Sequence, residues 1–122
     1  VLEVVRGQDA WNRILEANQF NDPPSQGGEY VLVKVRARYI GTADESVNLS
    51  GSDFQSTGGA NVLYEQTSVV EPEPAIDAYL FPGGVHEGWV TVMAAEGEVG
   101  MILVFDPLWD WSGDNVRFLG LE

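Results

Sequence analysis

The stretch that decides the fold is residues 29–39, which read Glu-Tyr-Val-Leu-Val-Lys-Val-Arg-Ala-Arg-Tyr. From position 31 onward, apolar or aromatic side chains recur at every second position: Val31, Val33, Val35, Ala37 and Tyr39. The residues between the later ones are positively charged: Lys34, Arg36 and Arg38. A period of two with β-branched residues predicts an antiparallel strand, with Val33 and Val35 in the core and Arg36 and Arg38 in solvent. We therefore expect a sheet with one buried face and one solvated face.

Length and composition bound the class of protein. The chain has 122 residues, of which 44% are hydrophobic, a proportion typical of a folded globular chain. This length corresponds to a single domain over residues 1–122, large enough to bury a core without disulfides or metals. Apolar runs stay below the roughly 20 residues that a membrane-spanning helix needs, so no membrane span is expected.

The charge balance excludes one class of partner. The chain carries 19 acidic and six basic residues, a formal net charge of −13. Nucleic-acid binding depends on Lys and Arg side chains that neutralise phosphates, so we expect no binding of DNA or RNA. An anionic membrane surface is disfavoured for the same reason. The acidic excess is most simply interpreted as a source of solubility.

Residues that catalytic and metal-dependent proteins require are scarce. The chain has no cysteine, which excludes disulfides, thiol nucleophiles and thiolate zinc sites. Its one histidine, His86, has no accompanying Gly-x-Ser-x-Gly sequence and is expected at the surface. Gly83, Gly84 and Gly88 lack the following Lys-Ser or Lys-Thr pair of a phosphate-binding loop. We expect neither an enzyme nor a resident cofactor.

The other strands are short and are separated by turn signals. Strands or short extended pieces are expected at residues 1–6, 47–49, 52–55, 76–81, 87–95, 99–105 and 116–121. The tight turn at residues 96–98 predicts that 87–95 and 99–105 pair with each other as a hairpin. Seven or more strands with frequent turns favour an all-β antiparallel sandwich.

One helix is expected near the N-terminus, over residues 9–17. Asp9 could cap it, and Trp11, Ile14 and Leu15 would then share one face at the spacing of a helix. The predicted fold class is therefore all-β with one short N-terminal helix.

Several short pieces of sequence follow one another in the order of a known family. They are Ala17-Asn18-Gln19-Phe20-Asn21 with Pro24, Gly28-Glu29-Tyr30-Val31-Leu32-Val33, Pro82-Gly83-Gly84, Gly88-Trp89-Val90, Leu103-Val104-Phe105-Asp106-Pro107 and Phe118-Leu119-Gly120-Leu121. In these pieces, which span most of its length, the chain resembles telokin-like, immunoglobulin-like extracellular bacterial domains of unknown function. Lipoproteins often carry these domains, which are related to a mycobacterial secreted antigen. The resemblance implies an immunoglobulin-like sandwich outside the cytoplasm or in the bacterial cell envelope, where a lipid anchor could precede Val1, and it implies no catalytic residues.

The loop at residues 106–115 contains a cluster of carboxylates. Ca²⁺ prefers several oxygen ligands brought together by a flexible loop, which makes Asp106, Asp110 and Asp114 candidate metal ligands. Their spacing differs from that of an EF-hand, whose acidic residues recur at every second position and end in Glu. The alternative interpretation is a solvated loop in which Asp114 stabilises a turn.

The same loop carries two of the four tryptophans, Trp109 and Trp111. Exposed aromatic side chains can stack on sugar rings or anchor a protein partner, and Asp110 lies between them as a polar ligand-binding candidate. The alternative is that one or both indoles fold back on the end of the sandwich. Trp89 alternates within a strand and is expected in the core.

The basic residues of the first long strand allow two interpretations. Lys34, Arg36 and Arg38 are half of all positive charges, so they could form an anion-binding stripe. They could instead pair with acidic residues on the neighbouring strand, and the 19 acids of the chain favour this second interpretation.

The expected function is a non-catalytic extracellular binding or interaction module with a protein or glycan partner. One alternative is a carbohydrate-recognising accessory domain that uses Trp109 and Trp111. Another is a structural domain stabilised by Ca²⁺.

Overall fold

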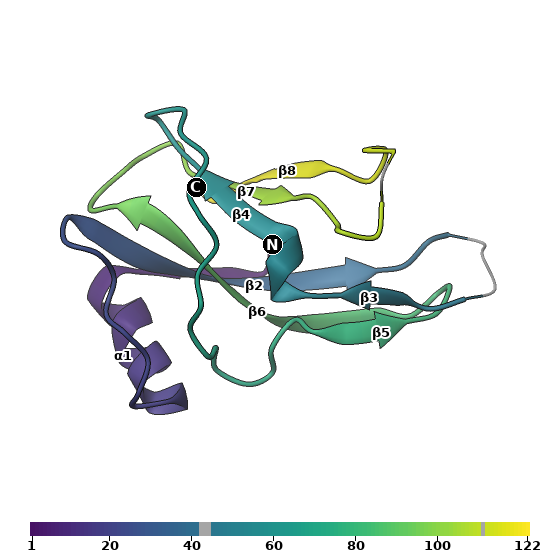
Figure 1. Cartoon of the computed structure of the whole chain (residues 1–122), viewed down its shortest axis with the longest axis horizontal. Coiled ribbons are helices and arrows are strands. Elements are labelled where there is room, and N and C mark those ends of the chain that lie inside the picture. Colours follow the sequence, from purple (N-terminus) through teal and green to yellow (C-terminus); the bar gives the residue numbers. More distant parts are fainter. Residues whose placement is uncertain (42–44, 111) are drawn as a thin grey trace.

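The fold is mainly antiparallel β-sheet with one α-helix (Figure 1). The computed structural model describes residues 1–41, 45–110 and 112–122. The elements are β1 (Glu3–Arg6), α1 (Gly7–Ala17), β2 (Gly28–Arg38), β3 (Val47–Leu49), the 3-10 helix η1 (Gly51–Asp53), β4 (Phe54–Thr57), β5 (Ala78–Leu80), β6 (Val85–Ala95), β7 (Ile102–Phe105) and β8 (Arg117–Gly120). They form a sheet in the order β1-β2-β6, a two-stranded sheet β3-β5 and a sheet in the order β4-β7-β8.

The pairing of β2 with β6 forms the centre of the fold. Both strands have 11 residues, and the register runs without interruption from Gly28 opposite Ala95 to Arg38 opposite Val85. Val33 and Val35 are buried, whereas Arg36 and Arg38 are exposed. The predicted register of this strand is confirmed.

The β4-β7-β8 sheet lies over one face of β2 and β6 (Figure 1). The two sheets share one apolar core, whose members include Val31, Val33, Val90, Val92, Phe54 and Leu103. A buried polar contact also joins them, because the Ser56 hydroxyl of β4 donates a 2.6 Å hydrogen bond to the Met93 carbonyl oxygen of β6. This arrangement is consistent with a β-sandwich.

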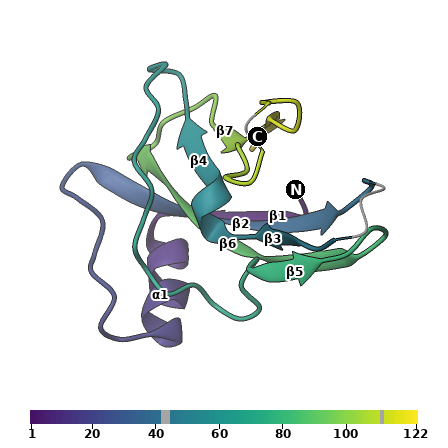
Figure 2. The ribbon, with the colours of Figure 1, turned by 45° about the vertical axis from the view of Figure 1, so that its right-hand side comes forward.

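The opposite face of β2 and β6 is not fully solvated, because α1 packs against part of it (Figure 2). Tyr30 and Leu32 are buried there with Ile14 of the helix and Trp89 of β6, so the expected core position of Trp89 is confirmed. The expectation of one solvated face is wrong for this end of the sheet. An amphipathic helix can bury its apolar stripe only against another apolar surface, and Leu32 supplies that surface.

The helix starts at Gly7, two residues before the predicted start, and Asp9 does not cap it. Pairing of β1 with β2 ends at Arg6, which is also the N-cap residue and makes no side-chain capping bond. Asp9 instead lies in the first turn, where a carboxylate interacts favourably with the helix dipole. Of the predicted face, Ile14 is fully buried.

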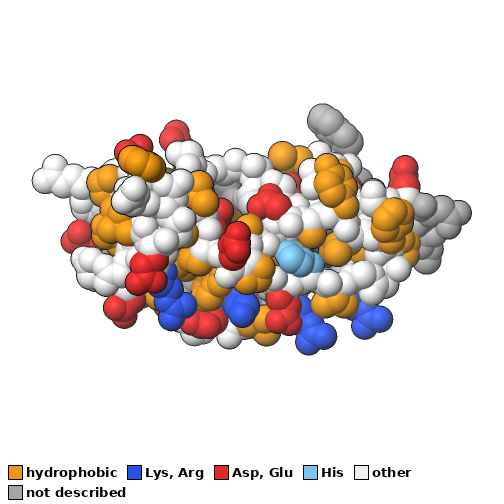
Figure 3. Space-filling view, turned by 90° about the horizontal axis from the view of Figure 1, so that it is seen from below, with side chains coloured by type: hydrophobic (Ala, Val, Ile, Leu, Met, Phe, Trp, Pro, Cys, Tyr) orange, Lys and Arg blue, Asp and Glu red, His pale blue; other side chains and the backbone are white. Residues whose placement is uncertain are grey.

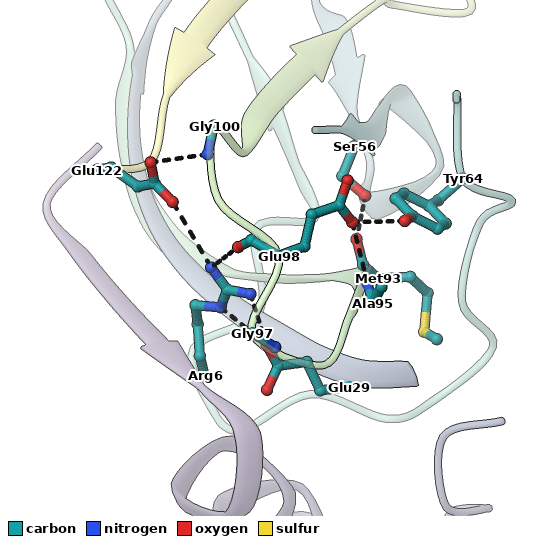
Figure 4. A network of polar contacts seen from close by, with 10 residues as sticks. All are labelled: Arg6, Glu29, Ser56, Tyr64, Met93, Ala95, Gly97, Glu98, Gly100 and Glu122. Carbon is teal, nitrogen blue, oxygen red and sulfur yellow. Dashed lines mark hydrogen bonds and ion pairs between the residues drawn. The ribbon is translucent and has the colours of Figure 1, made fainter. Parts of the chain in front are cut away.

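The predicted hairpin between residues 87–95 and 99–105 is wrong, because β7 pairs with β4 and β8 instead of β6. Gly97 and Gly100 adopt φ values of 71°, which let the chain leave one sheet and enter the other. The Glu98 carboxylate between them accepts a 2.5 Å hydrogen bond from the Tyr64 hydroxyl and a 3.0 Å bond from the Ala95 N–H (Figure 4). The hydrogen bond from Tyr64, aided by that from Ala95, lowers the pKa of Glu98.

An ion pair holds the other side of this crossing in place (Figure 4). The Arg6 guanidinium contacts Glu29 at 2.5 Å and donates a 2.7 Å hydrogen bond to the Glu98 carbonyl oxygen. Glu122 lies 3.8 Å from the same guanidinium and accepts a 2.8 Å hydrogen bond from the Gly100 N–H. The Arg6 side chain therefore links three parts of the chain: the start of β2, the crossing and the C-terminal residue.

The helix-covered core generates a stability prediction. Ile14→Ala should lower the free energy of unfolding by about 2–5 kcal/mol, since it removes a fully buried side chain and leaves a cavity. Urea unfolding followed by circular dichroism measures this change. The control is Glu16→Ala on the exposed side of the same helix, which should stay within about 0.5 kcal/mol of wild type. Equal effects of the two substitutions would contradict the packing of α1 on the sheet.

Candidate functional site

The acidic loop joins β7 to β8 and presents apolar side chains to solvent. Leu108 is 66% exposed and Trp109 is 38% exposed. Trp109 therefore reaches the surface, as a contact residue must. Trp111, the second tryptophan predicted to bind a ligand, lies outside the described residues.

Asp110 organises this loop from within. Its Oδ1 accepts hydrogen bonds from the Ser112 N–H at 3.0 Å and the Ser112 hydroxyl at 2.6 Å. Its Oδ2 accepts bonds from the Asn115 N–H at 2.9 Å and the Asn115 side-chain amide at 3.0 Å. The hydrogen bond from the Ser112 hydroxyl, followed by that from the Asn115 N–H, lowers the pKa of Asp110 to about 2. Both carboxylate oxygens thus stabilise the loop conformation, which leaves Asp110 less suited to the predicted ligand-binding role.

A second carboxylate, Asp53, fixes the start of the loop. It is buried at the end of η1, where its Oδ2 accepts a 3.0 Å hydrogen bond from the Ser50 N–H in a capping box. Its Oδ1 accepts a 2.9 Å bond from the Leu108 N–H, and its carbonyl oxygen accepts a 2.8 Å bond from the Asp106 N–H. Sequence reasoning missed Asp53, although a serine followed three residues later by an acid is the pattern of such a box.

The three predicted metal ligands do not come together as a site. Among the described residues there is no group of three or more Asp, Glu, His or Cys side chains that could hold a metal ion. Asp106 and Asp114 are exposed, and the oxygens of Asp110 are engaged within the loop. This geometry favours the solvated-loop interpretation for these residues, although Asp114 interacts through its backbone, accepting a 3.0 Å hydrogen bond from Arg117.

A cleft of about 270 Å³ lies beside the loop, where the two larger sheets and β3-β5 diverge. Its lining is mostly apolar and includes Leu49, Phe54, Leu80, Phe105 and Leu119. The polar groups of the lining come from Asn115 and from three arginines, Arg36, Arg38 and Arg117. It is slightly smaller than most small-molecule sites, and its lining combines apolar surface with positive charge. No sequence pattern predicted it, because its walls come from strands that are distant along the chain.

The predicted pairing of Lys34, Arg36 and Arg38 with acids on the neighbouring strand is not formed within the described residues. Ion pairs there join Arg6 to Glu29, Arg6 to Glu122 and Arg13 to Glu3. The register places an acid opposite two of them: Glu87 of β6 faces Arg36, and Glu3 of β1 faces Lys34, whereas Arg38 faces Val85. Glu3 pairs with Arg13 and not with Lys34. Lys34 instead places its ammonium 5.8 Å from the Trp89 ring centre. Figure 3 shows basic side chains along one edge of that view, with acidic side chains between them and over the rest of the surface.

His86 is half-buried, and its Nε2 lies 2.8 Å from the Ala75 carbonyl oxygen. This contact ties β6 to the segment before β5. No helix among the described residues is long and apolar enough to cross a membrane.

Comparisons with known proteins add no relative: no protein-family model, no curated protein and no solved structure matches the chain. The family resemblance therefore stays a prediction.

The role of Asp110 can be tested through its titration. NMR titration of the side-chain carboxyl should give a pKa of about 2, below the ordinary value of 3.8. Because the folded-state pKa is lowered, the stabilisation is present above the ordinary value and is lost as the pH falls through about 2. Ser112→Ala removes the strongest donor and should move the pKa upward. A wild-type midpoint near the ordinary value, or no change in the variant, would contradict this role.

Proposed function

We propose that this domain is a non-catalytic binding module that docks on a protein partner through Leu108 and Trp109. One observation carries the proposal: the loop holds its conformation through Asp53 and Asp110 while both apolar side chains stay exposed. Fixing a loop before binding reduces the entropy lost on association. Large apolar side chains at the centre of an interface supply most of its binding energy.

The charges around these side chains indicate the chemistry of the partner. Asp106 and Asp114 are exposed on the same loop, and the whole chain has a net charge of −13. A partner with an apolar pocket surrounded by Lys and Arg would complement this surface. Such complementarity would act mainly on the rate of association, which should fall as salt concentration rises.

A glycan partner is the second candidate, and the exposed ring of Trp109 is the feature that favours it. Sugar recognition also requires polar side chains free to bond hydroxyl groups beside the ring. The oxygens of Asp110 already accept four hydrogen bonds inside the loop, and the other large exposed neighbour, Leu108, is apolar. The surface therefore suits a protein better than a sugar.

The immunoglobulin-like topology and an extracellular or cell-envelope location belong to the same proposal. The shared core of two antiparallel sheets and the position of the loop between two strands support it. In such domains, loops that join strands are the usual contact sites.

The experiment compares three immobilised forms of the domain in affinity capture from secreted and cell-envelope fractions of the source organism. They are wild type, Leu108→Ser/Trp109→Ala, and Phe20→Ala as the control. Phe20 is 83% exposed and follows α1, so its loss removes apolar surface from a different element. Both variants should fold like wild type, since the altered side chains are at the surface.

The expected result is a protein retained by wild type and Phe20→Ala and lost from Leu108→Ser/Trp109→Ala. A glycan array probed with the same three forms addresses the second candidate. Glycan binding that requires Trp109, with no protein lost from the variant, would replace the protein proposal. Equal capture by all three forms would contradict the loop as the contact site.

A further inference from the structure

A second cavity, with a polar lining, lies beside β6 on the outer edge of its sheet. Its volume is about 180 Å³, and η1, the segment at 66–71 and β6 contribute to its walls. Most of the side chains that line it carry oxygen atoms: Ser50, Ser52, Gln66, Thr67, Glu71, Asp77 and Thr91. The lining contains no Lys, Arg or His. It therefore offers many oxygen atoms and no positive charge.

The Thr91 hydroxyl is the group in this lining that most directly indicates a bound species. The residue is only 6% exposed, and its Oγ1 has no hydrogen-bond partner among the described residues. Thr67 donates a 3.0 Å hydrogen bond to the Thr91 carbonyl oxygen, so the neighbouring backbone is satisfied while the hydroxyl is not. Buried polar groups in folded proteins almost always have a partner, which indicates that a bound species supplies one here.

Two carboxylates face the same cavity without a compensating cation. Neither Glu71 nor Asp77 forms an ion pair with the described residues. The Glu71 carboxylate lies close to Asp77 and to Thr91, but it does not reach hydrogen-bond geometry with the Thr91 hydroxyl. The Asp77 Oδ1 accepts a 3.2 Å hydrogen bond from the Gly51 N–H, whereas no described residue donates a hydrogen bond to its Oδ2. Two negative charges beside an unpaired hydroxyl are unfavourable unless a cation joins them.

We propose that this cavity binds a hard divalent cation, best fitted by Ca²⁺, through the carboxylates of Glu71 and Asp77 and the hydroxyl oxygen of Thr91. Ca²⁺ takes six to eight oxygen ligands in flexible geometry, and the serine hydroxyls and water can complete that number. Mg²⁺ demands a more rigid octahedral arrangement and gives up its water reluctantly, so it should bind more weakly. With only two carboxylates, the Kd for Ca²⁺ should lie in the range of about 10⁻⁴–10⁻³ M.

Such a site would add a connection between three parts of the chain, beside the backbone hydrogen bonds that already join Pro74 and Ile76 to Trp89. Glu71 lies in the long segment between β4 and β5, Asp77 directly precedes β5, and Thr91 belongs to β6. The cation would hold this segment against the sheet. The site is separate from the loop at 106–115 and does not depend on the proposed function.

The test is isothermal titration of CaCl₂ into chelator-treated protein at low ionic strength, with thermal unfolding in CaCl₂ and in chelator. Wild type should bind one Ca²⁺ and should melt at a higher temperature in CaCl₂. Glu71→Gln/Asp77→Asn should weaken binding by at least about tenfold, because it removes both charged ligands. The control is Asp106→Asn/Asp114→Asn, which removes the same charge from the acidic loop and should bind like wild type.

The Thr91→Val substitution tests whether Thr91 is a Ca²⁺ ligand or is needed only for folding. It should weaken Ca²⁺ binding while leaving the melting temperature in chelator equal to or above that of wild type, since an unpaired buried hydroxyl is removed. Wild-type protein that binds no Ca²⁺ at concentrations up to about 10 mM, tenfold above the expected range, would overturn the proposal and leave the cavity to water. Loss of binding in the loop variant with retention in Glu71→Gln/Asp77→Asn would also overturn it.

Discussion

The uninterrupted pairing of β2 with β6 is the constraint on which the other elements depend. Because both strands have 11 residues, they extend far enough to carry different neighbours at different points. One face meets the β4-β7-β8 sheet, and the end near Leu32 is covered on the other face by α1 (Figure 2). Both faces of the same strand pair are therefore partly buried, which gives a chain of 122 residues two apolar clusters without any disulfide.

The crossing between β6 and β7 determines where the loop at 106–115 lies, because it directs the chain from the first sheet into the second. Arg6 and the Glu98 carboxylate fix the crossing from opposite sides, so β7 enters the second sheet in a defined register (Figure 4). The loop after β7 then leaves the sheet beside η1, where Asp53 accepts the N–H groups of Asp106 and Leu108. Polar contacts far from Trp109 thus determine where its side chain meets solvent. A scaffold of rigid strands with function on a connecting loop is common in β proteins.

Sequence pattern correctly predicted features that depend on neighbouring residues. It failed for features that depend on contacts between distant parts of the chain. The period of two placed Val35 and Arg36 correctly, because alternation follows from backbone geometry alone. The hairpin was wrong because a two-glycine crossing resembles a tight turn until its pairing partners are known. Sequence pattern also could not predict the role of Asp53 or the unpaired hydroxyl of Thr91, because both depend on contacts between residues far apart in sequence. The loop was predicted as a contact region from its tryptophans, whereas the cleft beside it left no local signal.

The central claim is that the described residues of this loop, 106–110 and 112–115, are ordered before any partner binds. Backbone ¹⁵N relaxation of the free domain tests it most directly, because it reports the mobility of individual amides. The account predicts order parameters for Leu108, Trp109 and Asn115 of about 0.8, close to those of rigid strand backbone. Values below about 0.6 at these amides would show a flexible loop and would contradict the claim.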